Sequence, residues 1–366
     1  MTDELSKREQ EIVDGTVWTQ FCDTLKMAGN VVMGPNAPSD PLNRMEGFRY
    51  LSRITGAALK AFVEHNDPLA PVLMRVVHET AKMGSDHPDN YYQNASISGE
   101  HEYRIRGNRG TVHYLGFFTQ IGNYGQSRGM PPSGYLEASS LEVDEDGSFE
   151  IVVSTERKPG NWLPMKKETG TLIVRQTFLD RETEKLAELD IERIGGDGKP
   201  TPFDPVRCAD GMQMSASLVA GAAMLFASWA EGFKAHTNKL PRFDQEKSNQ
   251  AGGVPDIAYY HSYWKLAPDE ALVIEAMPPE CDHWNFQLNN YWMESLDYRY
   301  YPVHVNKHTA NYRPDGSVQV VVAAENKGFE NWIDTVGHTE GTMCWRWVRA
   351  DENLEPETRV VKLSEL

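Results

Sequence analysis

Cysteine is scarce in this sequence. The four cysteines, Cys22, Cys208, Cys281 and Cys344, are far apart and show no C-x-x-C spacing. They are too few to cross-link a chain of 366 residues, so we expect reduced thiols. The first twelve residues also lack the basic start, apolar stretch and small-residue cleavage site of a signal peptide. Both absences favour a cytoplasmic protein.

Basic residues are outnumbered by acidic ones. Lys and Arg total 36 against 53 Asp and Glu, which gives a net charge of −17. Such a field repels phosphate backbones and anionic lipid, so nucleic acid and membrane are not expected as partners. The longest apolar run, Met214 to Ala230, is interrupted by serines and a glycine. It is too short and too polar for a membrane span, and a buried or half-buried helix is the better prediction.

Several motifs that carry chemistry are missing. The sequence has no G-x-x-x-x-G-K-S/T phosphate loop, no H-E-x-x-H zinc helix and no H-x-H pair. It also has no glycine fingerprint after a strand and no alternating βαβ pattern, which argues against a nucleotide-binding parallel sheet. We therefore expect no cofactor, and a small molecule as the binding partner. A homo-oligomer is left open.

The sequence repeats itself once. The Asp-Gly turn and β-branched run at 146–153 reappear at 315–322, and the Asn-Trp pair at 161–162 reappears at 331–332. The offset stays near about 170 residues across these landmarks, which is the signature of a duplicated unit. Asp-Gly followed by β-branched residues predicts a turn that leads into a strand.

The repeat sets the predicted architecture: an α+β, mainly β fold of two duplicated β-sandwich or jelly-roll-like modules, each preceded by a helical segment. The expected first repeat is 1–195, with a helical lead at about 44–82 and a β-module at about 90–180, and the expected second repeat is 206–366, with a helical lead at about 212–238 and a β-module at about 258–350.

Blocks spread over most of the chain resemble a bacterial family known as domain of unknown function 1214. The blocks are Met45–Leu51, Pro88–Asn90, Tyr103–Gly107 and Arg175 in the first repeat, and Leu266–Leu272, Glu294–Tyr298, Asn331–Thr335, Gly337–His338, Gly341 and Arg346–Trp347 in the second. The resemblance implies a fold rich in β-structure. It implies no settled reaction.

Comparison of the two repeats separates scaffold residues, which should recur, from site residues, which need not. His338, Asp334, Asp297 and Glu294 have counterparts of other types in the first repeat, so they are the predicted catalytic residues. Asp334 and His338 are four apart in one loop, and an imidazole beside a carboxylate can run acid/base chemistry at neutral pH. The alternative is an Asp that caps a turn beside an exposed His.

Aromatic residues and one arginine are the predicted substrate-binding groups. Trp284, Trp292 and Tyr260 could wall a pocket for an apolar or ring-shaped ligand, although such residues more often form the core. Arg346 joins them, but it recurs as Arg175, so bracing a strand is its alternative role.

A metal site is the alternative for the histidines. His283, His304, His308 and His338 all lie in the second repeat, and Asp297 or Glu294 could supply a further ligand for zinc or iron. Scattered structural histidines are the simpler interpretation, and His113 holds the place of His283 in the first repeat. The predicted site therefore contains no metal.

A basic cluster of Arg104, Arg106 and Arg109 has two interpretations of equal weight. It could bind a carboxylate or sulfate, or it could pair with surface Asp and Glu.

These observations together predict an enzyme that acts on a small apolar or aromatic substrate by acid/base chemistry, such as hydration, elimination or hydrolysis, without a nucleotide cofactor. One alternative is a sugar or lipid binding module without turnover. The other is a metal-dependent enzyme that uses the second-repeat histidines.

Overall fold

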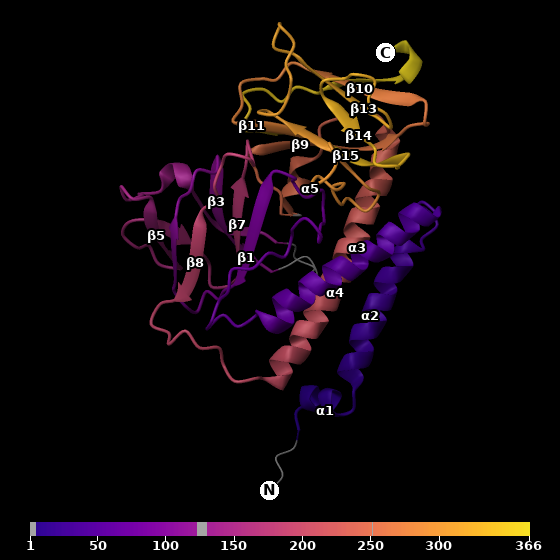
Figure 1. The fold of residues 1–366 in the computed structure, drawn as a ribbon. Helices are drawn as coiled ribbons and strands as arrows, with labels where there is room; N and C mark the ends of the chain where they lie inside the picture. The colour runs from indigo at the N-terminus through magenta and orange to yellow at the C-terminus, as the bar shows by residue number, and fades with distance from the viewer. Residues whose placement is uncertain (1–4, 123–129, 251) are drawn as a thin grey trace. The chain divides into compact units, whose positions relative to one another are not determined.

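The computed structural model describes residues 5–122, 130–250 and 252–366 (Figure 1). The chain forms two compact units, each assembled from three stretches of sequence. The first unit combines the chain up to Val31 with Leu51–Ala81 and Asn90–Ala223, and the second combines Val32–Tyr50, Lys82–Asp89 and Met224–Leu366.

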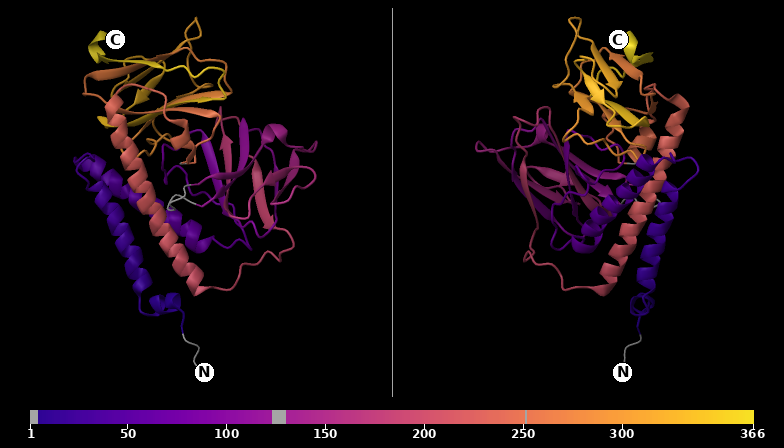
Figure 2. Two further views of the ribbon diagram at one scale, coloured as in Figure 1. Left: turned by 180° about the vertical axis from the view of Figure 1, so that it is seen from behind. Right: turned by 45° about the vertical axis from the view of Figure 1, so that its right-hand side comes forward.

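Helices occupy the N-terminal region and the segment between the two sets of strands (Figure 2). They are α1 (Lys7–Val13), α2 (Thr16–Val32), α3 (Pro41–Leu59) with a π-helical turn at Lys60–Glu64, α4 (Pro205–Phe233) with a 3-10 turn at Lys234–His236, and α5 (Gln245–Gln250); single 3-10 turns lie at Ala138–Ser140 and Leu363–Glu365. Among the described residues, the helical segment Pro205–His236 is long and apolar enough to cross a membrane, but half of its apolar window is buried within the protein.

The first unit contains two four-stranded sheets, ordered β1-β7-β3-β4 and β6-β5-β2-β8. Their strands are β1 (Asn90–Ser96), β2 (Tyr103–Asn108), β3 (Tyr114–Ile121), β4 (Pro132–Glu137), β5 (Ser148–Ser154), β6 (Trp162–Pro164), β7 (Thr169–Thr177) and β8 (Glu188–Arg193). Inner faces of both sheets contribute to one hydrophobic core, to which Ile105, Phe117, Ile151 and Leu172 belong.

The second unit repeats this arrangement, with sheets ordered β12-β11-β15-β9 and β14-β13-β10-β16. Its strands are β9 (Ile257–Lys265), β10 (Glu270–Ala276), β11 (His283–Asn289), β12 (His304–Asn306), β13 (Val318–Ala323), β14 (Trp332–Asp334), β15 (Glu340–Val348) and β16 (Glu357–Lys362). Adding eight to each strand number of the first unit reproduces both orders, and β6 and β14 each pair in parallel with the preceding strand. The predicted duplication and β-rich fold are confirmed.

The core of the second unit is unusually rich in tryptophan. Trp284 stacks on Trp345 with ring centroids 4.9 Å apart, and Trp347 packs edge-on against Trp345 at 5.1 Å. All three rings lie between the two sheets and are almost inaccessible to water. Each such ring buries a large apolar area, so this core is a major source of stability for the unit.

The first predicted helical lead, 44–82, is too long. The structure has helix only from Pro41 through the π-helical turn that ends at Glu64. Pro68 and Pro71 follow soon after, and a residue that precedes proline disfavours the helical conformation. Helices α1 and α2 were absent from the prediction.

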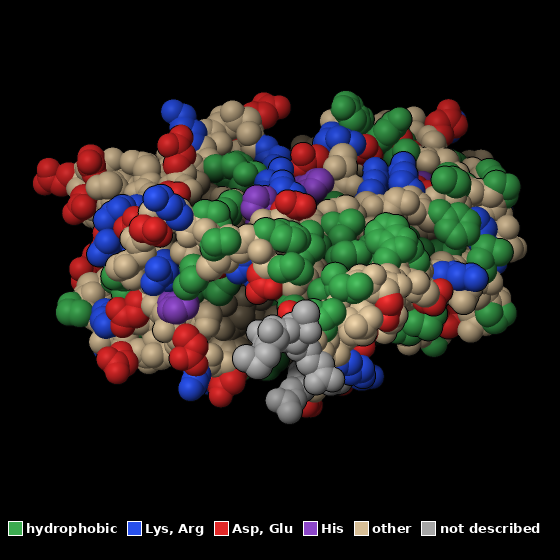
Figure 3. All heavy atoms as spheres, turned by 90° about the horizontal axis from the view of Figure 1, so that it is seen from below, with side chains coloured by type: hydrophobic (Ala, Val, Ile, Leu, Met, Phe, Trp, Pro, Cys, Tyr) green, Lys and Arg blue, Asp and Glu red, His purple; other side chains and the backbone are tan. Residues whose placement is uncertain are grey.

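Charged side chains of both signs lie interspersed on the face drawn in Figure 3. In the first unit, Arg104 and Arg106 each form ion pairs with Glu150 and Glu192 on neighbouring strands. Of the two interpretations of this basic cluster, the structure therefore shows pairing with surface carboxylates for these two arginines.

We predict that Gly47→Ala destabilises the protein while Gly56→Ala, in the same helix α3, does not. A Cβ at Gly47 would lie 2.7 Å from both the Trp292 ring and Val32, whereas nothing lies within 4 Å of a Cβ at Gly56. Overpacking costs about 1–3 kcal/mol, and removing a helical glycine in open space gains about 0.5–1 kcal/mol. Thermal unfolding of both variants checks this, and equal melting temperatures would contradict it.

Candidate functional site

Strand β11 separates two kinds of side chain onto its two faces. Its even-numbered residues, from Trp284 to Leu288, point into the core between the sheets. Its odd-numbered residues, from His283 to Asn289, are His, Asn, Gln and Asn, and every one of them is buried. Because successive side chains of a strand alternate between faces, the four polar residues form one row on the outer face of the sheet. A buried row of this kind needs partners to satisfy it.

Neighbouring strands extend this polar face. Arg346 of β15 lies opposite Asn285, and His304 of β12 lies opposite Gln287. The Arg346 guanidinium donates to the side-chain oxygens of Asn285 and Gln287, at 3.2 and 2.5 Å. A charged donor thus lies among neutral acceptors, and all three side chains are buried.

A segment that precedes the first strand, Lys82–Asp89, lies on the polar face; we call it the strap. Arg346 Nη2 donates to the Ser85 carbonyl at 2.5 Å, and Gln287 Nε2 donates to the Asp86 carbonyl at 2.8 Å. Asn289 Nδ2 donates to Ser85 Oγ at 3.0 Å. These bonds tie the strap to strands β11 and β15, which lie between 201 and 261 residues away in the sequence.

Further contacts fix the conformation of the strap. The Asp86 carboxylate accepts from the backbone N–H and the hydroxyl of Ser295, at 2.9 and 2.8 Å. Lys82 Nζ donates to the Ser295 carbonyl at 2.7 Å. The chain turns at Gly84, whose φ of 64° suits glycine, and a Cβ there would lie 2.6 Å from the Phe226 ring. The strap is therefore held along its length in one path.

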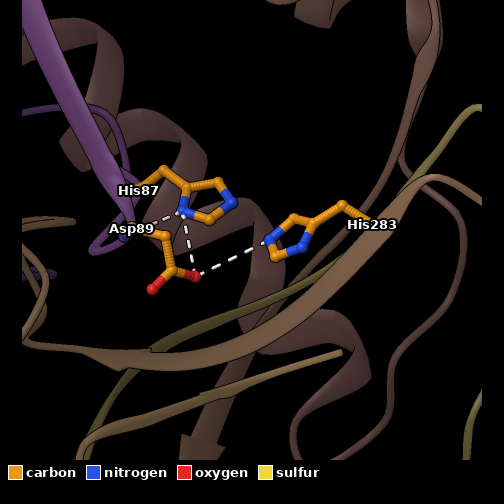
Figure 4. Close-up of side chains that lie close together, drawn as sticks. All are labelled: His87, Asp89 and His283. Carbon is orange, nitrogen blue, oxygen red and sulfur yellow. Dashed lines mark hydrogen bonds and ion pairs between the residues drawn. The ribbon is translucent and has the colours of Figure 1, made fainter. Parts of the chain in front are cut away.

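The strap ends in a cluster of ionisable side chains (Figure 4). His87 and Asp89 come from the strap, His283 begins β11 and His304 begins β12. Asp89 Oδ1 lies 3.0 Å from His304 Nε2, while Asp89 Oδ2 lies 3.6 Å from His283 Nε2 and 3.7 Å from His87 Nδ1. The rings of His87 and His283 stack with centroids 5.6 Å apart. One carboxylate thus faces three imidazoles.

Burial and charge set the ionisation of the cluster. Burial alone would raise the pKa of Asp89, but the charge and hydrogen bond of His304 hold it well below its usual range. Burial, with the nearby Arg346 charge, lowers the pKa of His87 well below its usual value. The carboxylate is therefore ionised and the His87 ring neutral at physiological pH.

Several polar atoms of the cluster are buried without a hydrogen-bond partner. Both ring nitrogens of His283 lack one, and so do Asp89 Oδ2 and His304 Nδ1. Among the four side chains, His304 is the most accessible, with 18% exposed against 3% for Asp89. An unsatisfied buried donor or acceptor is costly, so these atoms point to a binding function for the cluster.

Aromatic rings surround His261 of β9, a strand of the same sheet. His261, opposite Cys344, stacks between Phe233 and Tyr259 at centroid distances of 5.7 and 5.5 Å, and Phe243 meets it edge-on. Burial among these rings lowers the pKa of His261 to about 3, so the ring is neutral.

The predicted catalytic pair of His338 and Asp334 does not form in the described hydrogen bonds. His338 Nε2 lies 2.9 Å from Glu46 of helix α3, and its Nδ1 faces the carbonyls of Thr335 and Val336. Asp334 Oδ1 instead accepts the backbone N–H of Val336 at 2.7 Å, which caps the local turn. The histidine is buried beside a carboxylate, but the carboxylate comes from a helix far away in the sequence.

The other two predicted catalytic carboxylates lie apart from the cluster contacts. Asp297 accepts two hydrogen bonds from Arg299, at 2.8 and 2.7 Å, near the surface. Glu294 is buried and accepts from Asn290 Nδ2 at 2.9 Å, within the turn that follows β11.

The predicted substrate-binding residues have structural contacts. Trp284 and Tyr260 belong to the core between the sheets, and Trp292 donates from its indole N–H to the Asn43 carbonyl at 2.8 Å. Arg346 lies on the polar face and holds the strap. The structure thus brings Arg346 to the histidine cluster and leaves the aromatic residues in packing roles.

Of the histidines considered for a metal, His283 and His304 meet at Asp89, while the described contacts place neither His308 nor His338 in the cluster. The sequence reasoning missed His87 and Asp89. Their signal was the close spacing of an imidazole and a carboxylate in His87-Pro88-Asp89.

Three comparisons place the chain among known proteins. The family model described as protein of unknown function DUF1214 matches residues 90–177. An uncharacterized protein from Burkholderia cenocepacia, known from a crystal structure, is 50% identical over 98% of this chain and 99% of its own, with a TM-score of 0.95. The VPA0106 protein from Vibrio parahaemolyticus is 12% identical over 93% of this chain and 100% of its own, with a TM-score of 0.50, which shows a common fold alone. A comparison with curated proteins gives no match.

We predict that the contribution of the His338–Glu46 pair to stability falls as pH rises. Burial opposes charge on His338, but the hydrogen bond and charge of Glu46 raise its pKa above the usual value. A histidine whose pKa is higher in the folded than in the unfolded state stabilises the fold. This stabilisation is complete at a pH below the pKa of the unfolded state, about 6.5, and is lost as the pH rises through the pKa of the folded state.

His338→Gln should therefore lower the melting temperature more at about pH 6 than at about pH 9, with about 1.5–3 kcal/mol lost at the lower pH. Thermal unfolding at several pH values measures this. Glu168→Gln, at an exposed position, is the control and should show no such trend. A pH-independent difference for His338→Gln would contradict the prediction.

Proposed function

The chain belongs to the DUF1214 family of proteins of unknown function, and we propose that it is an enzyme that uses the His87–Asp89–His283–His304 cluster on a small molecule. The proposed reaction is a polar one, a hydration, elimination or hydrolysis, and needs no nucleotide cofactor. The proposal keeps the reaction class that the sequence suggested and moves its centre from His338 to Asp89 and His304.

One observation carries the proposal: an ionised carboxylate, 3% exposed, lies among three imidazoles. Structural cores seldom bury charges and titratable rings together. A buried group of either kind loses its hydration, and this cost is offset only if hydrogen bonds or ion pairs replace the lost water. Active sites bury such groups together because neighbouring charges tune proton affinity there. The two ring nitrogens of His283 add to this argument because they are buried without a hydrogen-bond partner. A histidine with a packing role alone would be expected to have its buried nitrogens hydrogen-bonded.

The geometry assigns roles to two members of the cluster. Asp89 Oδ1, 3.0 Å from His304 Nε2, would fix the tautomer and the orientation of the ring. His304 is the more accessible of the two, so its ring is the one that would exchange a proton with a substrate. Asp89 then acts as a positioning residue through His304.

The substrate class in the proposal is apolar or aromatic. The aromatic rings of Phe233, Phe243 and Tyr259 support it, because they surround His261 of β9, a strand of the same sheet as the cluster, and place apolar groups beside polar ones. Arg346, two residues along β15 from Cys344, has no role in substrate binding in this proposal. Its guanidinium fixes the strap through the Ser85 carbonyl.

The test is metabolite profiling with purified protein and a small-molecule extract of bacterial cells. We expect the wild-type protein to deplete at least one compound. The product should differ from it by a single water, or two products should together contain the atoms of the compound, with or without one added water. Asp89→Asn and His304→Gln should slow this conversion by about 100-fold or more, the usual contribution of acid/base catalysis.

His101→Gln, in the turn between β1 and β2 of the first unit, is the matched control and should convert the compound as the wild type does. The proposal is wrong if no compound is converted, or if Asp89→Asn and His304→Gln are as active as the control. Depletion of a compound without a product would indicate binding without turnover.

A further inference from the structure

We propose that Asp89, His283 and His87 together bind one divalent transition-metal ion. The inference concerns the cluster of the proposed function, but it does not depend on turnover. All three residues belong to the second unit, and one ligand atom from each lies within 4.8 Å of the others.

The spacing of the ligand atoms fits an ion at the centre of the cluster. Two ligands that bind zinc at about 2.0–2.2 Å with tetrahedral angles lie about 3.3–3.6 Å apart. Asp89 Oδ2 lies 3.6 Å from His283 Nε2 and 3.7 Å from His87 Nδ1. These distances are too long for hydrogen bonds and close to those of ligands that share an ion.

The unsatisfied atoms lie where the ion would bind. Asp89 Oδ2 has no hydrogen-bond partner although it is buried, and neither has His283 Nε2, the nitrogen that faces it. An ion between them would satisfy both atoms at once. Figure 4 shows the carboxylate oxygen directed toward both rings, with the ring of His283 entering from the opposite side to His87.

The surroundings of the ligands resemble the outer partners of a metal site. His304 Nε2 bonds the other oxygen of Asp89 at 3.0 Å, which fixes the carboxylate and leaves Oδ2 for the ion. The strap that bears two of the ligands is fixed by Arg346, Gln287 and Ser295. His87 Nδ1 also accepts the backbone N–H of Asp89 at 3.1 Å, and coordination through this nitrogen would replace that bond.

The ligand set selects the kind of ion. Two imidazoles and one carboxylate suit zinc, iron(II), cobalt(II) or manganese(II), whereas calcium and magnesium prefer ligand sets made of oxygen. Three protein ligands leave coordination positions open, as in catalytic sites. A bound ion there would act as a Lewis acid that polarises water or a substrate oxygen.

The test uses the whole protein, stripped with a chelator and titrated separately with zinc and cobalt(II) ions. We expect one equivalent of zinc by elemental analysis after desalting, and visible absorption from cobalt(II) in a low-symmetry nitrogen and oxygen site. Zinc should raise the melting temperature, because an ion that binds only the folded state stabilises it by mass action.

Asp89→Asn and His283→Gln, which keep side-chain size, should each weaken zinc binding at least 100-fold, while His101→Gln should bind as the wild type does. Far-UV circular dichroism of each metal-free variant separates loss of binding from loss of folding, and His87→Gln provides a third ligand variant if one of the others unfolds. The inference is wrong if the stripped wild-type protein takes up no stoichiometric metal, or if folded ligand variants bind as tightly as the control.

The outcomes also separate this inference from the proposed function. Conversion of a metabolite by a stripped protein that takes up no stoichiometric metal, with the conversion lost in Asp89→Asn, would overturn the metal site and leave the enzyme. Stoichiometric zinc that depends on His283 in a protein that converts nothing would overturn the enzyme and leave the metal site.

Discussion

The buried guanidinium of Arg346 is the interaction on which the candidate site depends. Its hydrogen bonds run to Asn285 and Gln287 on β11 and to the Ser85 carbonyl of the strap. A buried charge that water does not hydrate needs such hydrogen-bond acceptors. Removal of one acceptor leaves part of the charge unpaired and destabilises the fold. Because these acceptors lie on both the sheet and the strap, satisfying the charge also fixes the segment that delivers His87 and Asp89 to the histidines of the sheet.

Duplication supplied the same scaffold twice but this polar surface once. The residues of β3 that correspond to the polar row of β11 are Tyr114, Gly116, Phe118 and Gln120, and they carry no imidazole. His283 is buried beside Asp89, whereas Tyr114, which takes its place in the register of β3, is only half-buried. His113, which the sequence suggested as the counterpart of His283, lies one residue earlier and is exposed. Equivalent positions in a repeat thus share backbone geometry, while burial, and with it chemistry, differs between the copies.

This difference explains how far the sequence could predict the molecule. The Asp-Gly turns that precede β5 and β13 were predictable, because Gly147 and Gly316 both adopt a φ of 85° that favours glycine. The site was not, because its parts are distant in the chain: His87 and Asp89 precede the first module, and Glu46, the partner of His338, lies in α3. A comparison of the two repeats considers only residues at equivalent positions. It therefore misses a segment, such as Lys82–Asp89, that precedes the first β-module but packs in the second unit.

The duplicated sequence repeat and the compact unit that carries the site therefore have different boundaries. The second compact unit takes Val32–Tyr50 and Lys82–Asp89 from the part of the chain that precedes the first β-module. Without these two stretches, residues 206–366 would keep all eight strands, yet Glu46, His87 and Asp89 would be missing and Arg346 would lose the Ser85 carbonyl. The site therefore forms only when the early and late segments have paired. Its assembly is an event of tertiary folding, and the polar row of β11 is stable only as a consequence of that pairing.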